Sequence, residues 1–161
     1  MEPLVTYANN LHTYQVYRCT QDDIPVHVSY VEKVWQDTGT DLVTQEERMS
    51  EAVDNGYAYY LTTDDELSAF LYYVIPSINK VAVAAWVRTY REAYIGMGYL
   101  LYNQRINRII FLTHSEKLAY SKLLSSKYFM PKEKAWLCNI SFNDNTHKKH
   151  IQQVFKNLRV V

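Results

Sequence analysis

The sequence is poor in glycine and cysteine and contains no long apolar run. Only 4 of its 161 residues are glycine, so few backbone positions allow a ligand to approach the main chain closely. The two cysteines, Cys19 and Cys138, match no metal-binding spacing, and we expect free thiols in a reducing cytosol. No stretch approaches the roughly 18 apolar residues that a membrane span needs, and no secretory leader is visible. We therefore expect a cytoplasmic protein without a membrane partner.

A formal net charge is also absent, but the charged residues are unevenly distributed. Residues 1–66 hold 13 acidic and 3 basic side chains, whereas residues 117–161 hold 2 acidic and 9 basic ones. This asymmetry can mark a surface for a charged partner, or the two ends of the chain can attract each other across the fold. We prefer the second interpretation. The length suits a single domain over residues 1–161.

What the sequence does contain is a regular succession of strand and helix patterns. Strands are expected at residues 12–19, 57–62, 67–75, 81–87, 109–113 and 135–142. Helices are expected from Ile24, from Thr44 to a stop at Gly56, over about 96–108, and from Ser115 to about Ser126, with a loop over 88–94. The order predicts an α/β fold with a mixed sheet: an antiparallel meander followed by βαβαβ, with helices on both faces.

The last segment, about 144–161, predicts an additional C-terminal amphipathic helix. Ile151, Val154, Phe155 and Leu158 stand at helical spacing on one face. His147 and His150 are three residues apart and could chelate a metal, but no cysteine or carboxylate partner is evident, so we expect a solvated helix face and no metal. Zero net charge and the lack of a known binding motif argue against a dedicated nucleic-acid-binding protein.

The order of elements and one local motif resemble the GNAT superfamily of acyl-CoA N-acyltransferases. The motif lies in the stretch Trp86 to Leu100. In the family's strand–loop–helix signature an Arg or Gln is followed three and five residues later by Gly or Ala. Arg91 and Gly96 stand at the first and last of these positions, and Tyr94 stands at the middle one. The resemblance implies a GNAT-like fold for nearly the whole chain, with the final helix as an addition.

The resemblance also implies acetyl-CoA as the cofactor. Its binding residues would be Val87, Arg91, Tyr94, Ile95 and Gly96. In such a site the pyrophosphate lies on main-chain N–H groups at a helix N-terminus, where the amides and the helix dipole favour an anion. Small residues let the backbone reach the phosphate oxygens. Tyr94 adds bulk at this point, although it could also point outward or donate its hydroxyl.

Catalytic residues follow from a second comparison with the family. After the strand at 109–113 the family has an Asn and then a helix with a Tyr that protonates the leaving CoA thiolate. Here His114 replaces the Asn and Tyr120 is the candidate acid, although the strict position could fall on Ser121. His114, Glu66 and Glu92 are the candidates for a general base, and spacing selects none of them.

Two functions therefore stay open. The departures at Tyr94 and His114 favour a catalytically silent GNAT-fold protein for binding or assembly. The stretch 111–128 is similar in layout to internal head-assembly proteins of short-tailed phages. That similarity implies virion proteins as partners, the basic C-terminal helix as a contact, and the host cytoplasm or virion as the location. The alternative is an active N-acetyltransferase that moves an acetyl group from acetyl-CoA to an amine of a small molecule or protein.

Overall fold

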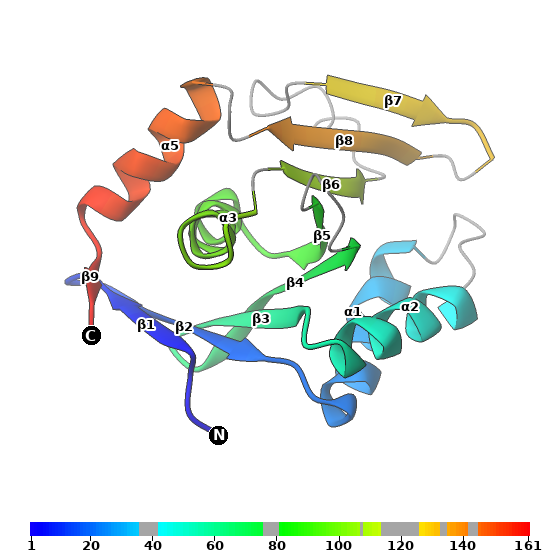
Figure 1. Cartoon of the computed structure of the whole chain (residues 1–161), viewed down its shortest axis with the longest axis horizontal. Helices are drawn as coiled ribbons and strands as arrows, with labels where there is room; N and C mark the ends of the chain where they lie inside the picture. Colours follow the sequence, from blue (N-terminus) through cyan, green and yellow to red (C-terminus); the bar gives the residue numbers. More distant parts are fainter. Residues whose placement is uncertain (36–41, 76–80, 107, 114–125, 133–134, 142–144) are drawn as a thin grey trace.

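The computed structural model describes residues 1–35, 42–75, 81–106, 108–113, 126–132, 135–141 and 145–161. Within these ranges nine strands join in one sheet, in the order β7-β8-β6-β5-β4-β3-β2-β1-β9. The strands are β1 (Val5–Ala8), β2 (Thr13–Arg18), β3 (Ala58–Thr63), β4 (Glu66–Ile75), β5 (Val81–Val87), β6 (Arg108–Thr113), β7 (Ser126–Met130), β8 (Ala135–Ser141) and β9 (Arg159–Val160). The sheet is curved and surrounds one helix on its inner face (Figure 1).

Antiparallel pairing joins β1 through β5 in sequence order. The turn between β3 and β4 places Asp64 and Asp65 at φ angles of 50° and 67°. Two consecutive positive φ angles are typical of the two-residue turns that match the twist of a hairpin. The predicted antiparallel meander is therefore confirmed, and its turn at residues 63–66 lies where the sequence indicated.

The second half of the sheet differs in part from the prediction. β5 and β6 are parallel and joined through α3 (Tyr90–Gln104), which confirms the first βαβ unit. The predicted second crossover is wrong, because β8 runs antiparallel to β6. An unpredicted strand, β7, precedes β8 and forms a hairpin with it, so the direction of the chain reverses. The predicted helix from Ser115 lies outside the described residues, and Ser126, its predicted end, is instead the first residue of β7.

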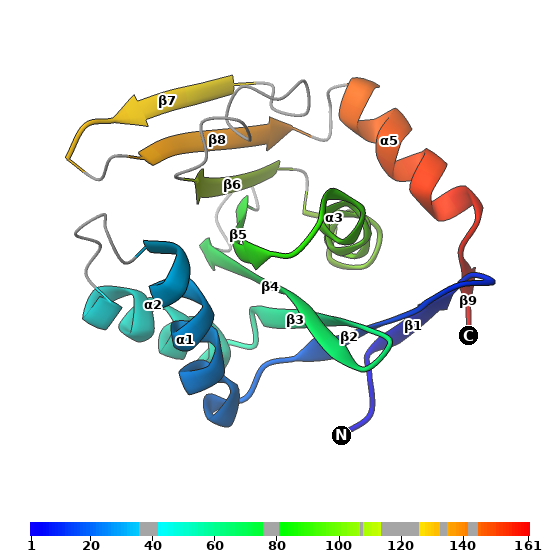
Figure 2. The ribbon, with the colours of Figure 1, turned by 180° about the vertical axis from the view of Figure 1, so that it is seen from behind.

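Helices cover both faces of the sheet (Figures 1 and 2). α1 (Ile24–Trp35) and α2 (Leu42–Asp54) cover the outer face, and α3 lies in the curved inner face. A short 3-10 helix, η1 (Gln21–Asp23), leads into α1, and the Asp23 carboxylate accepts a 2.7 Å hydrogen bond from the N–H of its cap residue Thr20. Thr44, the predicted cap of the second helix, lies inside α2, whereas the predicted stop at Gly56 is confirmed by its φ of 74°.

The sheet separates two apolar clusters. The inner cluster packs α3 and α5 (Asn145–Lys156) against the sheet, and its fully buried members include Val16, Leu61, Ile95, Leu100 and Ile151. The outer cluster under α1 and α2 is smaller and consists of Cys19, Ile24, Met49, Ala52, Ala58 and Phe70. Burial of these side chains supplies the main driving force for the fold. Among the helices within the described ranges, none is long and apolar enough to cross a membrane.

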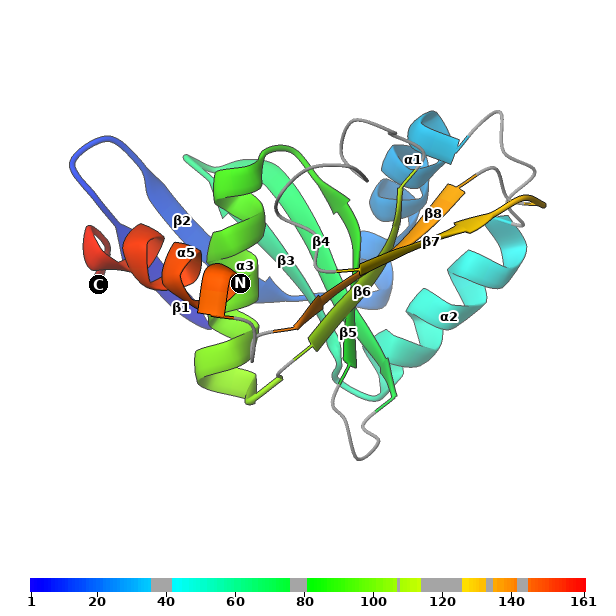
Figure 3. The same ribbon diagram turned by 90° about the horizontal axis from the view of Figure 1, so that it is seen from above.

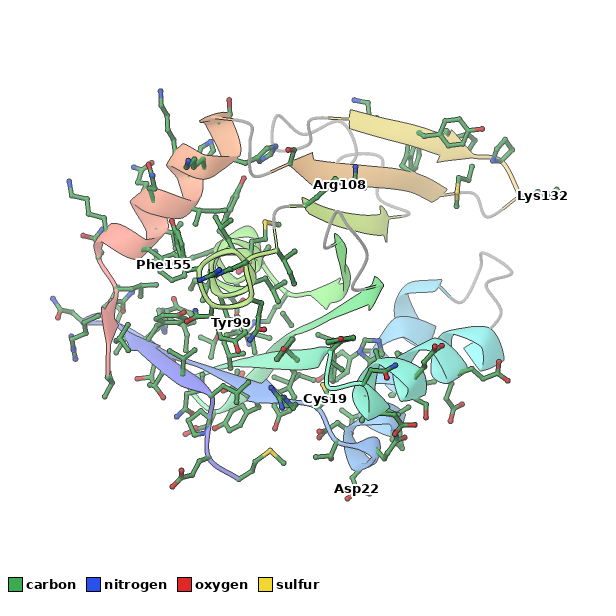
Figure 4. The ribbon with its side chains drawn as sticks, in the orientation of Figure 1. Cys19, Asp22, Tyr99, Arg108, Lys132 and Phe155 are labelled. Atoms are coloured by element: carbon green, nitrogen blue, oxygen red, sulfur yellow. The ribbon has the colours of Figure 1, made fainter. Side chains whose placement is uncertain are left out.

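The predicted C-terminal helix exists as α5, but the predicted extent to residue 161 is wrong, because the helix ends at Lys156 and a short strand follows. α5 packs across α3 rather than standing apart from the core (Figure 1). Phe155 of α5 lies between the two helices (Figure 4), with its ring 5.0 Å from that of Tyr7 and 5.6 Å from that of Tyr102. The following strand β9 pairs antiparallel with β1 through Ala8↔Arg159. The segment after Asn145 therefore closes the open side of the curved sheet.

Candidate functional site

The predicted cofactor motif begins where β5 ends and α3 starts. Only Arg88 and Thr89 separate the two elements, so the predicted loop over 88–94 is wrong in extent. The reason is a helix cap: the Thr89 hydroxyl accepts a 3.3 Å hydrogen bond from the Glu92 N–H and donates a 2.8 Å bond to the Glu92 carboxylate. Thr89 and Glu92 match the T-x-x-E spacing of a capping box, a signal that was present in the sequence.

The early start of α3 changes the surroundings of the motif residues. Tyr94, Ile95 and Gly96 lie inside the helix and are buried, whereas Arg91 in the first turn is exposed. In an α-helix each main-chain N–H donates to the carbonyl four residues earlier, so the amides of residues 94–96 are occupied by the helix itself. Val87 is the last residue of β5 and pairs with Ala69 of β4.

The phenol ring of Tyr94 stacks on the imidazole of His150 from α5, at a centroid distance of 5.7 Å and an interplanar angle of 28°. Tyr94 is 6% exposed. The large residue at the middle position of the motif is therefore part of the packing between α3 and α5. His147, the other histidine of this helix, is buried, so the predicted solvated helix face is wrong for that residue.

Glu92 is the buried centre of a polar cluster at the N-terminus of α3. Its carboxylate accepts hydrogen bonds from the Thr63 hydroxyl and from Arg88, at 3.1 Å to Nε and 3.0 Å to Nη2. Burial, the largest single influence, raises the pKa of Glu92, but the hydrogen bonds led by Arg88 together hold this pKa below its ordinary value. Glu92 is therefore an ionised group that is held by the protein, and it is a poor proton acceptor near neutral pH.

Glu66 is the other carboxylate at this end of the sheet. It contacts Arg88 at 3.2 Å between Oε2 and Nη1, and its side chain is 78% exposed. The structure thus brings two of the three predicted base candidates, Glu66 and Glu92, to the same arginine. The third, His114, and the predicted acid, Tyr120, lie outside the described residues, so their roles stay predictions.

A further feature of this region is the short ladder between β5 and β6. The two parallel strands pair only at Val81↔Arg108 and Ala82↔Ile109. β5 continues to Val87 and β6 to Thr113, and no further pairing joins them within these residues. The ends of β5 and β6 near the N-terminus of α3 therefore do not pair with each other.

The chain matches no known protein-family model and no curated protein sequence. Solved structures do match it over most of its length. An uncharacterized protein from Bacillus halodurans matches with a TM-score of 0.59 at 11% identity, over 98% of this chain and 99% of that one. RimJ from Mycobacterium smegmatis, solved in complex with CoA-disulfide, matches with a TM-score of 0.55 at 12% identity, over 99% of both chains. A GNAT-family acetyltransferase from Bacillus cereus matches with a TM-score of 0.52 at 16% identity, over 78% of this chain and 94% of that one.

The chain has the GNAT fold. At these identities the similarity establishes the architecture, and the predicted fold class is confirmed. In terms of this fold, the resemblance predicts acetyl-CoA at the α3 N-terminus and at the ends of β5 and β6 that do not pair with each other. The group of residues named for that role, from Val87 to Gly96, is thus gathered at one end of the sheet, but most of it lies within a helix.

A second candidate site on the GNAT fold is too small for a substrate. The outer cluster encloses a cavity of about 20 Å³ lined by Cys19, His27, Tyr59 and Phe70 among others. This volume corresponds to about one water molecule. Burial raises the pKa of the Cys19 thiol to about 12 and lowers the pKa of His27 to about 3. Neither group is therefore a thiolate nucleophile or a proton carrier at neutral pH. No group of His, Cys, Asp or Glu in the described ranges could hold a metal ion.

Proposed function

We propose that this GNAT-fold protein serves binding or assembly and does not transfer acetyl groups. The observation that carries the proposal is the position of Glu92. Its ionised carboxylate lies buried in the first turn of α3, where the resemblance predicts the pyrophosphate of acetyl-CoA. The protein's own anion thus takes up the favourable field of the helix N-terminus.

Electrostatics supports the proposal. A pyrophosphate at this place would approach the Glu92 carboxylate, and like charges at close range repel each other strongly in a partly buried site. Arg88 and Thr63, the nearby donors, already donate to Glu92. Binding of the cofactor would therefore require that these bonds break or that Glu92 becomes protonated, and both changes cost free energy.

Packing supports it as well. The stacking of Tyr94 on His150 and the burial of Ile95 give the middle of the motif a role in the α3–α5 contact. The helical amides of residues 94–96 would have to leave their hydrogen bonds before they could donate to phosphate. A once-open cofactor loop would in this way have become an ordinary capped helix.

Thermal unfolding with and without acetyl-CoA tests the proposal. A ligand that binds only the folded state raises the melting temperature by mass action. We expect millimolar acetyl-CoA to raise the melting temperature of the wild type no more than inorganic tripolyphosphate does, and Tyr94→Gly to add no further rise, because the helix rather than the side chain occupies the amides. Acetylation of an amine by the purified protein would refute the proposal. A protein that stays monomeric and never enters a larger complex would contradict the assembly role.

The alternative function is that of an active acetyl-CoA-dependent N-acetyltransferase, and one observation favours it. The two-pair ladder between β5 and β6 leaves the rest of both strands without mutual hydrogen bonds, which would suit a pantetheine chain between them. Arg91, with Val87 and Gly96, would then frame the cofactor, and Tyr120 or His114 would handle protons. In that case acetyl transfer to an amine would be measurable, and Tyr120→Phe or His114→Ala would reduce kcat.

The predicted virion partners belong to the same proposal. The basic C-terminal segment, with Lys148, Lys149, Lys156 and Arg159, contains no acidic residue after Asn145 and would offer a contact for an acidic protein surface. Co-purification of the protein with particles of a phage that encodes it is the test. A protein found only free in the host cytoplasm would contradict the virion role.

A further inference from the structure

A groove with only basic and neutral lining residues lies on the side of α3 that faces α5. Its volume is about 470 Å³, and it is formed by the turn of the β1–β2 hairpin, the first turn of α3 and the chain from the end of α5 into β9. The lining residues are Asn9, Asn10, Leu11, Arg91, Lys156, Asn157, Leu158 and Arg159. Figure 3 shows the hairpin and α5 on the same side of α3, with β5 and β6 on the other.

The described lining residues give this groove a net positive charge. Arg91, Lys156 and Arg159 contribute three cations, and none of the lining residues within the described ranges is acidic. All three side chains are exposed, and among the described residues none of them has an ion-pair partner. Cations that converge around a concave surface without a counter-charge create a local field that attracts anions. The groove therefore fits a ligand with several negative charges.

The walls of the groove are held in place by the fold. The Asn9 side chain accepts hydrogen bonds from the N–H groups of Leu11 and His12, at 2.8 and 2.7 Å, which fixes the hairpin turn. Arg159 is fixed by its strand pairing with Ala8, and Arg91 belongs to the helix turn that Thr89 caps. Because this backbone is ordered before binding, mainly side-chain freedom is lost when the ligand arrives.

We propose that this basic groove binds a small ligand that carries two or more phosphate groups. Three cations match the two to four charges of a diphosphate or triphosphate, and the planar guanidinium groups of Arg91 and Arg159 can each donate two parallel hydrogen bonds to phosphate oxygens. Asparagine amides supply neutral donors, and the exposed Leu11 offers an apolar contact for the rest of the ligand. The volume lies within the range of about 300–1,000 Å³ that is usual for small-molecule sites.

This groove shares Arg91 with the predicted cofactor region and is otherwise formed by different residues. Among the described residues, none of β5 or β6 lines the groove, and neither does Glu92 nor any residue named for acetyl-CoA other than Arg91. Its ligand therefore does not depend on the short β5–β6 ladder, and the inference stands whether or not the protein transfers acetyl groups.

Isothermal titration calorimetry with inorganic tripolyphosphate tests the proposal on the full chain. The critical variant is K156Q/R159Q, and the matched control is K148Q/K149Q, which removes the same number of charges from exposed positions of the same segment outside the groove. We expect binding by the wild type and the control, and a Kd raised by about tenfold or more in K156Q/R159Q because two charge-assisted contacts are lost. Arg91→Gln should also weaken binding.

Two outcomes would overturn the proposal. One is no measurable heat with the wild type at millimolar tripolyphosphate and low salt. The other is an equal loss in both double variants, which would show attraction to the overall charge of the segment rather than to the groove. Acetyl-CoA itself carries phosphates, so its titration is repeated with K156Q/R159Q. Binding that survives in this variant belongs to the α3 N-terminus and contradicts the proposed function, whereas binding that is lost belongs to the groove.

Discussion

The ring of Phe155 on α5 lies against Gly98 of α3, so close that a Cβ atom at residue 98 would overlap the ring. In an open helix Gly→Ala would raise stability by about 1 kcal/mol. Here we expect Gly98→Ala to lower the free energy of unfolding by about 1–3 kcal/mol, because the ring must move. Urea denaturation at pH 7 measures the change.

A double-variant cycle checks that the ring is the cause. Phe155→Ala should cost about 2–3 kcal/mol by itself, since the ring is partly buried. In G98A/F155A the added methyl group has room, so the two costs should not add. Additive costs would show that residue 98 is limited by something other than this contact.

The ion pairs of Arg88 give a second prediction. Glu92→Gln should lower the free energy of unfolding by about 1–3 kcal/mol, because it removes a buried charge with several hydrogen bonds and leaves Arg88 without its main partner. Glu66→Gln removes the charge of the exposed partner of Arg88 and should lower the free energy of unfolding by less than about 0.5 kcal/mol. Urea denaturation of both variants compares the two, and equal losses would contradict the buried role of Glu92.

The effect of Glu92 should also depend on pH in a defined direction. Its pKa in the folded protein is lower than the ordinary value of 4.5, so its stabilisation is present above about pH 4.5 and is lost as the pH falls through the folded value. The difference between wild type and Glu92→Gln should therefore shrink at low pH. A difference that stays constant from pH 7 down to pH 3 would argue against an ionised Glu92.

The buried, neutral His27 should make the protein less stable in mild acid. Burial lowers its pKa in the folded protein to about 3, from an ordinary value of 6.5, so the unfolded chain binds a proton that the folded chain does not. Between pH 6.5 and about 3 the free energy of unfolding should fall by up to about 1.4 kcal/mol per pH unit from this group. His27→Met should flatten the profile between pH 6.5 and 4.5, and an unchanged slope would mean that His27 does not stay neutral in the fold.

The β3–β4 turn gives a paired prediction. Asp65 has a φ of 67°, which glycine adopts without strain, so Asp65→Gly should raise the free energy of unfolding by about 0.5–1 kcal/mol. Asp64→Gly relieves a similar strain but removes contacts, since Asp64 accepts hydrogen bonds from His12 Nδ1 at 2.6 Å and from the Thr13 N–H at 2.9 Å. We expect Asp65→Gly to have the higher Tm in thermal unfolding. The reverse order would show that the contacts of Asp64 contribute little.

The elements that the sequence predicted well have strong local signals. The β3–β4 hairpin follows from Asp64-Asp65 between apolar runs. α5 follows from the spacing of Ile151, Val154 and Phe155, whereas Leu158, predicted on the same helix face, lies beyond its end. β1 was missed because it has only 4 residues, although it forms a hairpin with the next strand, β2. β9 has 2 residues and pairs with the distant β1, so it leaves no local pattern in the sequence. β7 was missed because only its first residue, Ser126, was assigned, as the end of a helix, and residues 127–130 were assigned no element, although Pro131 marks the following turn.

The candidate site was predicted only in part, for a physical reason. Arg91, Tyr94 and Gly96 were recognised from spacing along the chain, but the start of α3 depends on the cap formed by Thr89 and Glu92. Thr63, the buried partner of Glu92, lies on β3 whereas Glu92 lies on α3, and no pattern in the sequence connects the two residues. Likewise the basic groove joins Arg91 to Lys156 and Arg159, which only the folding of α5 onto α3 brings together.

The pairing of β9 with β1 links the order of synthesis to the order of folding. β1 is synthesised before the other strands of the sheet, yet one of its two neighbours is made only after α5 has been completed. Until then Gly98 lacks the ring that covers it and one edge of the sheet offers unpaired main-chain groups. A nascent chain interrupted before Phe155 should therefore expose this edge to other chains, whereas β9, once made, pairs with it at Tyr7 and Ala8.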